Sequence, residues 1–470
     1  PQQSGKIIPM DNKPKLSVTG YRAIWGKDLD EKIAFEYARS FARFIKNKNG
    51  KKVIVGRDAR VTGPIIFKSV REAFEKEGID VKYAGLLPTP TMLMLTKKNG
   101  YDAGVMITAS HNPPEYNGMK FIMPEGRLTN HEETNEIEKT RQSLNESEKI
   151  PTPGDASFNI DNFDNKEWRR IHIDEVLKNV DVELIKSKKF KVALDPINSG
   201  GSIIGQELLR ELGCEVHVIN GEPNGQFAHM PEPLEINLSG TASFVKEVAP
   251  DVGFVQDPDA DRLVLINEKG EFILEELMIS LVIKSVLSRN KESSKGKNVV
   301  VNLSTTRVCE DIAKEYGATL FRTPVGEAHV VKKMMETNAP IGGEGSGGAI
   351  YPLVGFFRDS LSGMALILEL LARENKKISE IVSALPKYVM KKDKFTITED
   401  INNIYQDLKA KWTDAKINTE DGARFDWEDS SWVHIRPSNT EPIVRVFGEA
   451  KDENRINTIF KEVRLTLASK

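Results

Sequence analysis

A strand–helix–strand unit recurs three times along the chain, and this repeat limits the fold more than any other feature of the sequence. Strand-type apolar runs begin at residues 53, 191 and 299. Each is followed by a helix-type segment, at 65–77, 204–212 and 307–316, and then by a second strand, at 81–84, 215–219 and 319–322. This alternation predicts parallel α/β units with right-handed crossovers.

A further strand and a distinctive loop follow each unit. The loops lie at 108–120, 257–262 and 342–348. Ligands bind beyond the strand ends of open α/β sheets, so three similar domains could each present one loop to a shared cleft. After about residue 387 the pattern changes to short strands, at 394–398, 431–435 and 443–447, and two helices, at 401–411 and 453–468.

We therefore predict an α/β protein with three similar mixed-sheet α/β domains and a smaller C-terminal α+β domain around one central cleft. The expected domains are residues 1–155, 156–268, 269–386 and 387–470. The polar segment 143–165, which contains Pro151-Thr152-Pro153-Gly154, is the expected linker between the first two. A length of 470 residues agrees with about three or four domains.

Net charge and cysteine content indicate which partners and which cellular compartment to expect. Lys and Arg number 66 against 69 Asp and Glu, a net charge of -3, which gives no reason to expect nucleic acid or a membrane surface. Cys214 and Cys309 lack CxxC spacing, so neither a disulfide framework nor a zinc site is indicated, and a reducing cytoplasm fits. No membrane-spanning run or signal-peptide pattern is found.

The first loop carries Ser110 between two strand-type runs. Two adjacent prolines and an Asn117-Gly118 turn signal predict a stiff, exposed loop with Ser110 facing solvent at the end of a strand. With His111 beside it and Lys120 on the returning strand, this hydroxyl could be a nucleophile or carry a transferred group. Taken alone, the stretch is more simply a loop serine beside a loop histidine.

The second loop brings three carboxylates together. Asp257, Asp259 and Asp261 alternate along what we expect to be extended backbone, so their side chains share one side and would repel unless a hard cation such as Mg²⁺ lay between them. Arg262 could hold a phosphate or offset their charge. It stands where an EF-hand needs glycine, and a strand follows, so calcium sensing is disfavoured. A solvated acidic turn is the simpler alternative.

The third loop, Gly342 to Gly348, matches GxGxxG only formally. A strand rather than a helix follows it, so the dinucleotide-binding interpretation fails. Glu344 and Ser346 would instead suit vicinal sugar hydroxyls, although a tight turn is the simpler interpretation. In the last domain Arg436, Ser438, Asn439 and Thr440 gather donors between two strands and predict a phosphate clamp.

These four loops, in this order, resemble the motifs of the α-D-phosphohexomutase family, which includes phosphoglucomutase, phosphomannomutase and phosphoglucosamine mutase. The matching stretches are Thr108–Pro113, Asp257–Arg262, Gly343–Gly347 and Arg436–Thr440. The resemblance implies that Ser110 is carried as phosphoserine, whose phosphate holds Mg²⁺ together with the three aspartates. It also implies phosphoryl transfer to a hexose phosphate, reorientation of a hexose 1,6-bisphosphate, and return of its other phosphate to the serine.

The same resemblance implies roles for the remaining residues. His111 and Lys120 become candidates for proton transfer and charge balance, and Arg22, on a loop that starts with glycine, reaches the phosphoserine. Glu344 and Ser346 would grip the sugar. The clamp residues Arg436, Ser438, Asn439 and Thr440 would bind the phosphate that does not react.

Three positions depart from the family's pattern. Gly348 and Glu327 stand where many bacterial members have histidine, and Ala23 stands where glycine is usual. His329 could take over a phosphate contact or simply pack. The leading substrate prediction is glucose or mannose phosphate, and phosphoglucosamine mutase is the alternative. A serine-dependent phosphomonoesterase and a non-catalytic sugar-phosphate sensor are alternatives from other classes. We expect a small-molecule sugar phosphate as partner and a monomer or homodimer.

Overall fold

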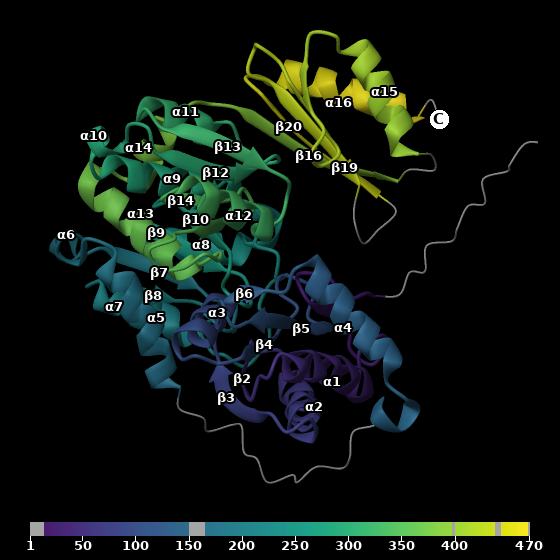
Figure 1. Ribbon diagram of the computed structural model, residues 1–470. Coiled ribbons are helices and arrows are strands. Elements are labelled where there is room, and N and C mark those ends of the chain that lie inside the picture. The colour runs from purple at the N-terminus through teal and green to yellow at the C-terminus, as the bar shows by residue number, and fades with distance from the viewer. Residues whose placement is uncertain (1–13, 150–164, 397–399, 438–442, 469–470) are drawn as a thin grey trace, which may run out of the picture.

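The computed structural model describes residues 14–149, 165–396, 400–437 and 443–468, and these form four sheets with helices packed against them (Figure 1). Three sheets are mixed and belong to α/β domains, while the fourth is antiparallel. The predicted fold class is therefore confirmed. Among the described helices, none is long and apolar enough to cross a membrane.

The first domain has a six-stranded sheet. Its strands are β1 (Tyr21–Ile24), β2 (Lys52–Arg57), β3 (Asp80–Leu86), β4 (Ala103–Ile107), β5 (Tyr116–Met123) and β6 (Arg127–Leu128). Its helices are α1 (Glu31–Asn47), α2 (Gly63–Lys76), α3 (Thr89–Lys98), α4 (His131–Ser143) and the 3₁₀ turn η1 (Glu146–Lys149). Asp30 caps α1 by accepting from the Ile33 amide, and the buried face of α1 stacks Phe41 on Phe121 of β5.

The second domain follows the expected linker, of which residues 150–164 lie outside the described part of the chain. Its helices are α5 (Lys166–Lys178), α6 (Val182–Lys188), α7 (Ser202–Glu211), α8 (Ser239–Val248) and the 3₁₀ turn η2 (Glu235–Asn237). Its sheet contains β7 (Lys191–Asp195), β8 (Glu215–Val218), β9 (Val252–Gln256), β10 (Leu263–Ile266) and β11 (Phe272–Ile273).

The third domain has four strands in its sheet, β12 (Asn298–Asn302), β13 (Thr319–Thr323), β14 (Ile341–Glu344) and β15 (Gly348–Ile350). Its helices are α9 (Glu275–Ser288), α10 (Lys291–Ser294), α11 (Val308–Glu315), α12 (Glu327–Thr337), α13 (Ser360–Glu374) and α14 (Ile378–Ser383). The third copy of the strand–helix–strand repeat is β12, α11 and β13. Each of the three domains also has helices outside its repeat unit.

One strand arrangement is common to the three mixed sheets. A central strand, β2, β7 or β12, lies between two parallel partners, which are β3 and β4, β8 and β9, or β13 and β14. The second of these partners then turns back into an antiparallel strand, β5, β10 or β15. The three distinctive loops are the connections at this turn, so they occupy equivalent places in the three domains.

The C-terminal domain is a five-stranded antiparallel sheet covered by two helices, and it forms the yellow end of the molecule (Figure 1). Its strands are β16 (Val389–Thr396), β17 (Lys416–Asn418), β18 (Ala423–Asp426), β19 (Trp432–Pro437) and β20 (Ile443–Ala450). Its helices are α15 (Ile401–Lys411) and α16 (Glu453–Ala468). This domain has a hydrophobic core of its own.

Candidate active site

Ser110 lies directly beyond the end of β4 and is held there by a buried arginine, Arg60. The guanidinium of Arg60 pairs with Asp58 and donates to four backbone carbonyls of the loop. These carbonyls belong to Ser110, Asn112, Pro113 and Tyr116, at 2.6–2.8 Å. Arg60 follows β2 in the run Arg57-Asp58-Ala59-Arg60, and this charged cluster beside a buried strand was the signal for it in the sequence.

The Ser110 hydroxyl is enclosed rather than exposed. Its Oγ lies 3.3 Å from Asp257 Oδ2, to which it donates, and 3.4 Å from His111 Nδ1. The residue is only 1% exposed, because the second domain's aspartate loop packs against the first domain's loop. The expectation that Ser110 faces solvent is therefore wrong, since a contact between domains decides its exposure.

The expected turn at Asn117-Gly118 is also absent, because both residues lie inside β5. There Gly118 pairs with Arg22, and a Cβ at Gly118 would lie 2.1 Å from the Tyr21 carbonyl oxygen. Close approach of β1 therefore requires this glycine. Arg22 accordingly lies in a strand rather than a loop, and Ala23, at the unusual position, is buried beside it.

The three aspartates meet in one buried cluster between β9 and β10. One carboxylate oxygen from each of Asp257, Asp259 and Asp261 lies within 4.8 Å of the others. The backbone is a turn with Ala260 at φ +52° rather than the extended segment we expected, but the carboxylates still converge. Strands flank the turn, as expected for a chain that is not an EF-hand.

Lys120 is the cation nearest these carboxylates. Its Nζ lies 2.5 Å from Asp259 and 3.4 Å from Asp261. Burial raises the pKa of Asp259, but the Lys120 ammonium, together with the Thr89 hydroxyl and the charge of Arg22, outweighs burial and lowers that pKa overall. Burial and the two neighbouring carboxylates instead raise the pKa of Asp257 well above its usual range. Lys120 therefore stabilises the charge of Asp259, whereas no cation among the described residues offsets the burial of Asp257.

The cluster fits a divalent cation. The Oδ1 atoms of Asp259 and Asp261 are buried without a hydrogen-bond partner among the described residues. A buried carboxylate oxygen without a partner is costly, and hard cations such as Mg²⁺ take carboxylate oxygens as ligands. Asp257, Asp259 and Asp261 therefore offer such an ion three oxygen ligands and leave positions for further ones.

Arginines surround His111, the neighbour of Ser110. Arg22 and Arg262 each have a buried Nε with no hydrogen-bond partner in the described part of the chain. The charge of Arg262, then burial, then the charges of Arg22 and Arg358, lower the pKa of His111 well below its usual value. The region next to Ser110 thus contains unpaired cationic donors and a neutral imidazole, which suit an oxyanion such as phosphate.

The glycine-rich loop is a tight connection between β14 and β15, as its context predicted. Glu344, at the end of β14, accepts through Oε1 from the Asn302 side chain at 3.0 Å and the Gly326 amide at 2.9 Å. Ser346 is partly buried in the turn. Glu327 begins α12 near Glu344, whereas His329, two residues later, is exposed.

One site residue, Arg358, had no motif in the sequence. It follows the loop after β15 and pairs with Asp261, Glu327 and Glu344. It therefore connects the aspartate loop of the second domain to the glycine-rich loop of the third. The unusual Glu327 was the available signal, because a buried carboxylate calls for a cation nearby.

The fourth domain contributes Arg436 at the end of β19. Its Nε lies 3.1 Å from Asp421 Oδ2, and Asp421 also accepts from the Val325 amide of the third domain at 2.9 Å. The other expected clamp residues, Ser438, Asn439 and Thr440, lie outside the described residues. The structure thus places one clamp residue next to the third domain.

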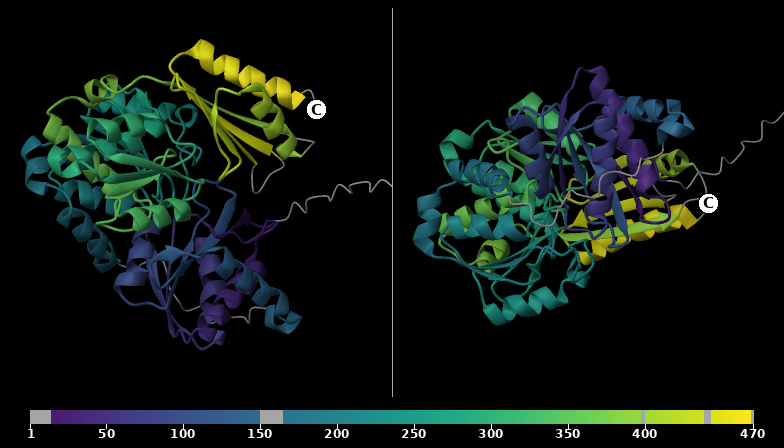
Figure 2. Two further views of the ribbon diagram at one scale, coloured as in Figure 1. Left: turned by 45° about the horizontal axis from the view of Figure 1, so that its top comes forward. Right: turned by 90° about the horizontal axis from the view of Figure 1, so that it is seen from below.

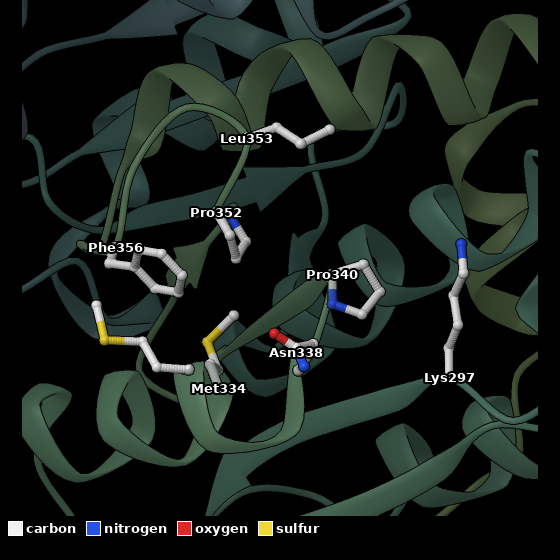
Figure 3. Close-up of a pocket in the computed structure, with 9 residues that line it drawn as sticks. Lys297, Met334, Asn338, Pro340, Pro352, Leu353 and Phe356 are labelled. Carbon is white, nitrogen blue, oxygen red and sulfur yellow. The ribbon is translucent and has the colours of Figure 1, made fainter.

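A separate cavity of about 620 Å³ lies on the third domain, lined by residues of α12, the segment before β14 and the loop after β15 (Figure 3). Met334, Leu353 and Phe356 make most of it apolar, and Lys297 is its only ionisable lining residue. It contains none of the predicted site residues. The loop cluster around Ser110, and not this cavity, contains the predicted catalytic and metal-binding residues.

Comparisons with known proteins agree with this geometry. Four profiles described as phosphoglucomutase/phosphomannomutase alpha/beta/alpha domains I, II and III and C-terminal domain match residues 14–148, 170–270, 275–388 and 388–466. The chain is similar to a phosphoglucomutase/phosphomannomutase of Thermococcus kodakarensis, with 36% identity over 452 residues that cover 93% of this chain and 94% of the relative.

Two further proteins extend the comparison. A phosphoglucosamine/phosphogalactosamine mutase of Sulfurisphaera tokodaii is 33% identical over 456 residues, 96% of this chain and 98% of the relative. A crystal structure of a phosphoglucomutase/phosphomannomutase family protein from Burkholderia thailandensis superimposes with a TM-score of 0.81 at 25% identity, covering 97% of each chain. The chain therefore belongs to the phosphoglucomutase/phosphomannomutase family, whose members are isomerases of the intramolecular phosphotransferase kind.

Proposed function

We propose that this chain interconverts the 1-phosphate and 6-phosphate of glucose or mannose through a phosphoserine at Ser110 and a hexose 1,6-bisphosphate. The observation that carries the proposal is the setting of Ser110 Oγ. It donates to Asp257 of a buried carboxylate cluster that fits a divalent cation, and it lies beside His111, whose surroundings include arginines with an unpaired donor. A phosphate on that oxygen would suit both the cation and the arginines.

The proposed reaction exchanges one phosphate ester for another. The phosphoryl group leaves Ser110 Oγ as a new P–O bond forms to the free hydroxyl of the sugar phosphate, whose proton is released. The bound bisphosphate then reorients, so that its other phosphate is transferred back to Ser110 Oγ and the second hexose phosphate is released. In phosphoryl transfer the enzyme accelerates the reaction mainly by positioning the reacting groups and by stabilising the charge on the transferred phosphoryl group.

Asp257, Asp259 and Asp261 would hold Mg²⁺ in this scheme, as the unpaired Oδ1 atoms support. The ion would neutralise charge on phosphate oxygens. We assign proton transfer to His111, which is next to Ser110 Oγ and held neutral, and charge balance to Lys120, which contacts the aspartates.

The remaining residues would bind substrate. Arg22 and Arg262 would contact the transferred phosphoryl group, and Glu344 and Ser346 the sugar hydroxyls. The clamp of Arg436, Ser438, Asn439 and Thr440 would bind the other phosphate. The cytoplasmic location and the choice between monomer and homodimer stay predictions of the sequence.

Phosphoglucosamine mutase is the second candidate. The observation that favours it is the carboxylate of Glu327, which lies with Glu344 around one arginine and could attract a sugar ammonium group. Relatives similar to this chain carry both names.

Turnover of glucose 1-phosphate, mannose 1-phosphate and glucosamine 1-phosphate, with Mg²⁺ and catalytic hexose 1,6-bisphosphate, tests the proposal while free phosphate is assayed. Isomerisation of the first two substrates supports it, and a clear preference for the third selects the second candidate. Phosphate release without isomerisation would instead indicate an esterase, and binding without turnover a sensor.

Ser110→Ala should lower turnover at least several hundredfold, because it removes the group that carries the phosphate. Ser40→Ala is the matched control, since that serine is also buried but bonds only within α1. Parent-like turnover in Ser110→Ala would contradict the phosphoserine mechanism.

A further inference from the structure

Arg358 occupies an unusual position among the site residues, because each of its three guanidinium nitrogens faces a different carboxylate. Nη2 lies 2.7 Å from Asp261, Nε 2.9 Å from Glu327 and Nη1 3.3 Å from Glu344. The side chain is 12% exposed, so water screens these contacts poorly. Arg358 is therefore the cation that pairs with both Glu327 and Glu344.

The surroundings hold both glutamates in place. Glu344 uses its second oxygen to accept from Asn302 and the Gly326 amide, so its orientation is fixed from two sides. Glu327 is the first residue of α12, where the helix dipole also favours a carboxylate. Arg358 itself is tied to Ile350 by a backbone bridge. The charge pattern is thus built into the fold.

Gly348 leaves room for this arrangement. A Cβ at Gly348 would lie 2.3 Å from Cδ and 2.9 Å from Cγ of Arg358, so no larger residue fits while the arginine takes this path. Gly348 and Glu327 are the two positions at which this sequence departs from a histidine pattern. Both positions contact the same side chain, since Arg358 passes over Gly348 and pairs with Glu327.

We propose that Arg358 is a specificity-determining residue, whose positive charge beside Glu327 and Glu344 sets the preference of the sugar site for neutral over amino sugars. This inference rests on the proposed function. A fixed guanidinium repels a sugar ammonium group and leaves a neutral hydroxyl unaffected, whereas Glu327 attracts the ammonium. With an effective dielectric constant of about 20, one unit charge about 12 Å away changes relative affinity by about tenfold, and a charge at closer range changes it by more.

The test is the ratio of kcat/KM for glucosamine 1-phosphate to that for glucose 1-phosphate, measured at slightly acidic pH where the amine is protonated. Arg358→Gln should raise this ratio by at least about tenfold, and Glu327→Gln should lower it by a similar factor. Arg358→Lys should keep the ratio within about threefold of the parent, because it retains the charge. Damage to folding or to metal binding affects both substrates and cancels in the ratio.

Arg289→Gln is the matched control, since this arginine also forms a partly buried pair, with Glu369, and its other partners are the Tyr351 hydroxyl and the Asn179 carbonyl rather than a site residue. Its ratio should equal that of the parent. An unchanged ratio in Arg358→Gln, or shifts of the same sign in Arg358→Gln and Glu327→Gln, would overturn the inference. If the parent binds both sugar phosphates but isomerises neither, the proposed function fails, and the ratio of the two Kd values decides the inference instead.

Discussion

The boundaries between domains are of two physical kinds. The first three domains share one continuous apolar cluster, which includes Leu93 of α3, Ile173 of α5, Leu208 of α7 and Leu366 of α13. Helix α13 of the third domain packs against α5, α6 and α7 of the second. The fourth domain keeps a separate apolar core and stands apart at one end of the molecule (Figure 2).

Polar contacts dominate where the third and fourth domains meet. Glu449 of β20 accepts from the Thr306 hydroxyl and the Arg307 amide of the third domain and from the Trp432 indole of its own. Other polar contacts across this boundary join Lys392 to Glu275 and Glu276, Ser304 to His434, and Arg424 to the Leu303 carbonyl.

The two kinds of boundary divide the predicted site: the Ser110, aspartate and glycine-rich loops lie on one side of the polar boundary, and the predicted phosphate clamp lies on the other. Ser110, the aspartate cluster and the glycine-rich loop lie on domains joined by apolar burial, which is non-directional and strong. Arg436 lies on a domain joined by hydrogen bonds and ion pairs, which water can replace at small net cost. We therefore expect the first three domains to unfold together and the fourth to unfold separately.

A change in the shared apolar cluster should have the largest effect. Met364 on α13 is fully buried, and its Cε lies near Gly205 of α7 in the second domain. Met364→Ala should lower the free energy of unfolding of the first three domains by about 2–5 kcal/mol. Three of the five tryptophans, Trp412, Trp427 and Trp432, are in the fourth domain, so fluorescence follows mainly that domain while circular dichroism follows the whole chain.

Urea unfolding followed by both signals measures the effect of Met364→Ala. The circular dichroism transition should move and the fluorescence transition should change little. Met364→Leu, which conserves volume, is the control. Equal shifts of both transitions would show that the fourth domain is not independent.

The contrast between the boundaries also explains what could be predicted from the sequence. The repeat was predictable because each unit is local, and the expected helix at 65–77 differs from α2 (Gly63–Lys76) only at its ends. The loops that carry Ser110 and the aspartates were predictable because each motif is continuous. The burial of Ser110 was not, because a loop about 147 residues away covers it.

Residues that act over long sequence separations were the hardest to find. Arg60 holds the Ser110 loop from 50 positions away within the first domain, and Arg358 of the third domain reaches Asp261 of the second over 97 positions. Such pairings depend on how strands and domains pack, and hydrophobic periodicity contains no information about them. The site roles assigned to Arg22, His111 and Lys120 stay predictions.

Acid should weaken the polar boundary. Burial lowers the pKa of His434 to about 4, so the folded imidazole is neutral, with Nε2 donating to the Asp421 carbonyl and Nδ1 accepting from Ser304. The unfolded histidine binds a proton near pH 6.5, so stability falls as the pH decreases from about 6.5 toward 4, by at most about 3 kcal/mol.

The fluorescence transition measured between these pH values gives the size of this loss. His434→Gln, which keeps polar atoms without titrating, should reduce the pH dependence, whereas His131→Gln on the surface of α4 should not. An unchanged slope in His434→Gln would mean that other groups cause the acid sensitivity.

The smallest effect is expected at Lys392, which pairs with Glu275 and Glu276 at 2.8 Å. Its side chain is one-third exposed, so solvent screens the ammonium, and the Gln amide can still donate to the two buried glutamates. Lys392→Gln should therefore cost only about 1–2 kcal/mol in the fluorescence transition. Lys391→Gln is the matched control, because that side chain contacts Asn457 within the fourth domain. If ion pairs contribute to the stability of this boundary, added salt should lower the stability that fluorescence measures for the parent toward the Lys392→Gln value. The same salt should not shift the circular dichroism transition of Met364→Ala. A loss at Lys392 as large as that at Met364 would mean instead that the two boundaries differ in composition but not in strength.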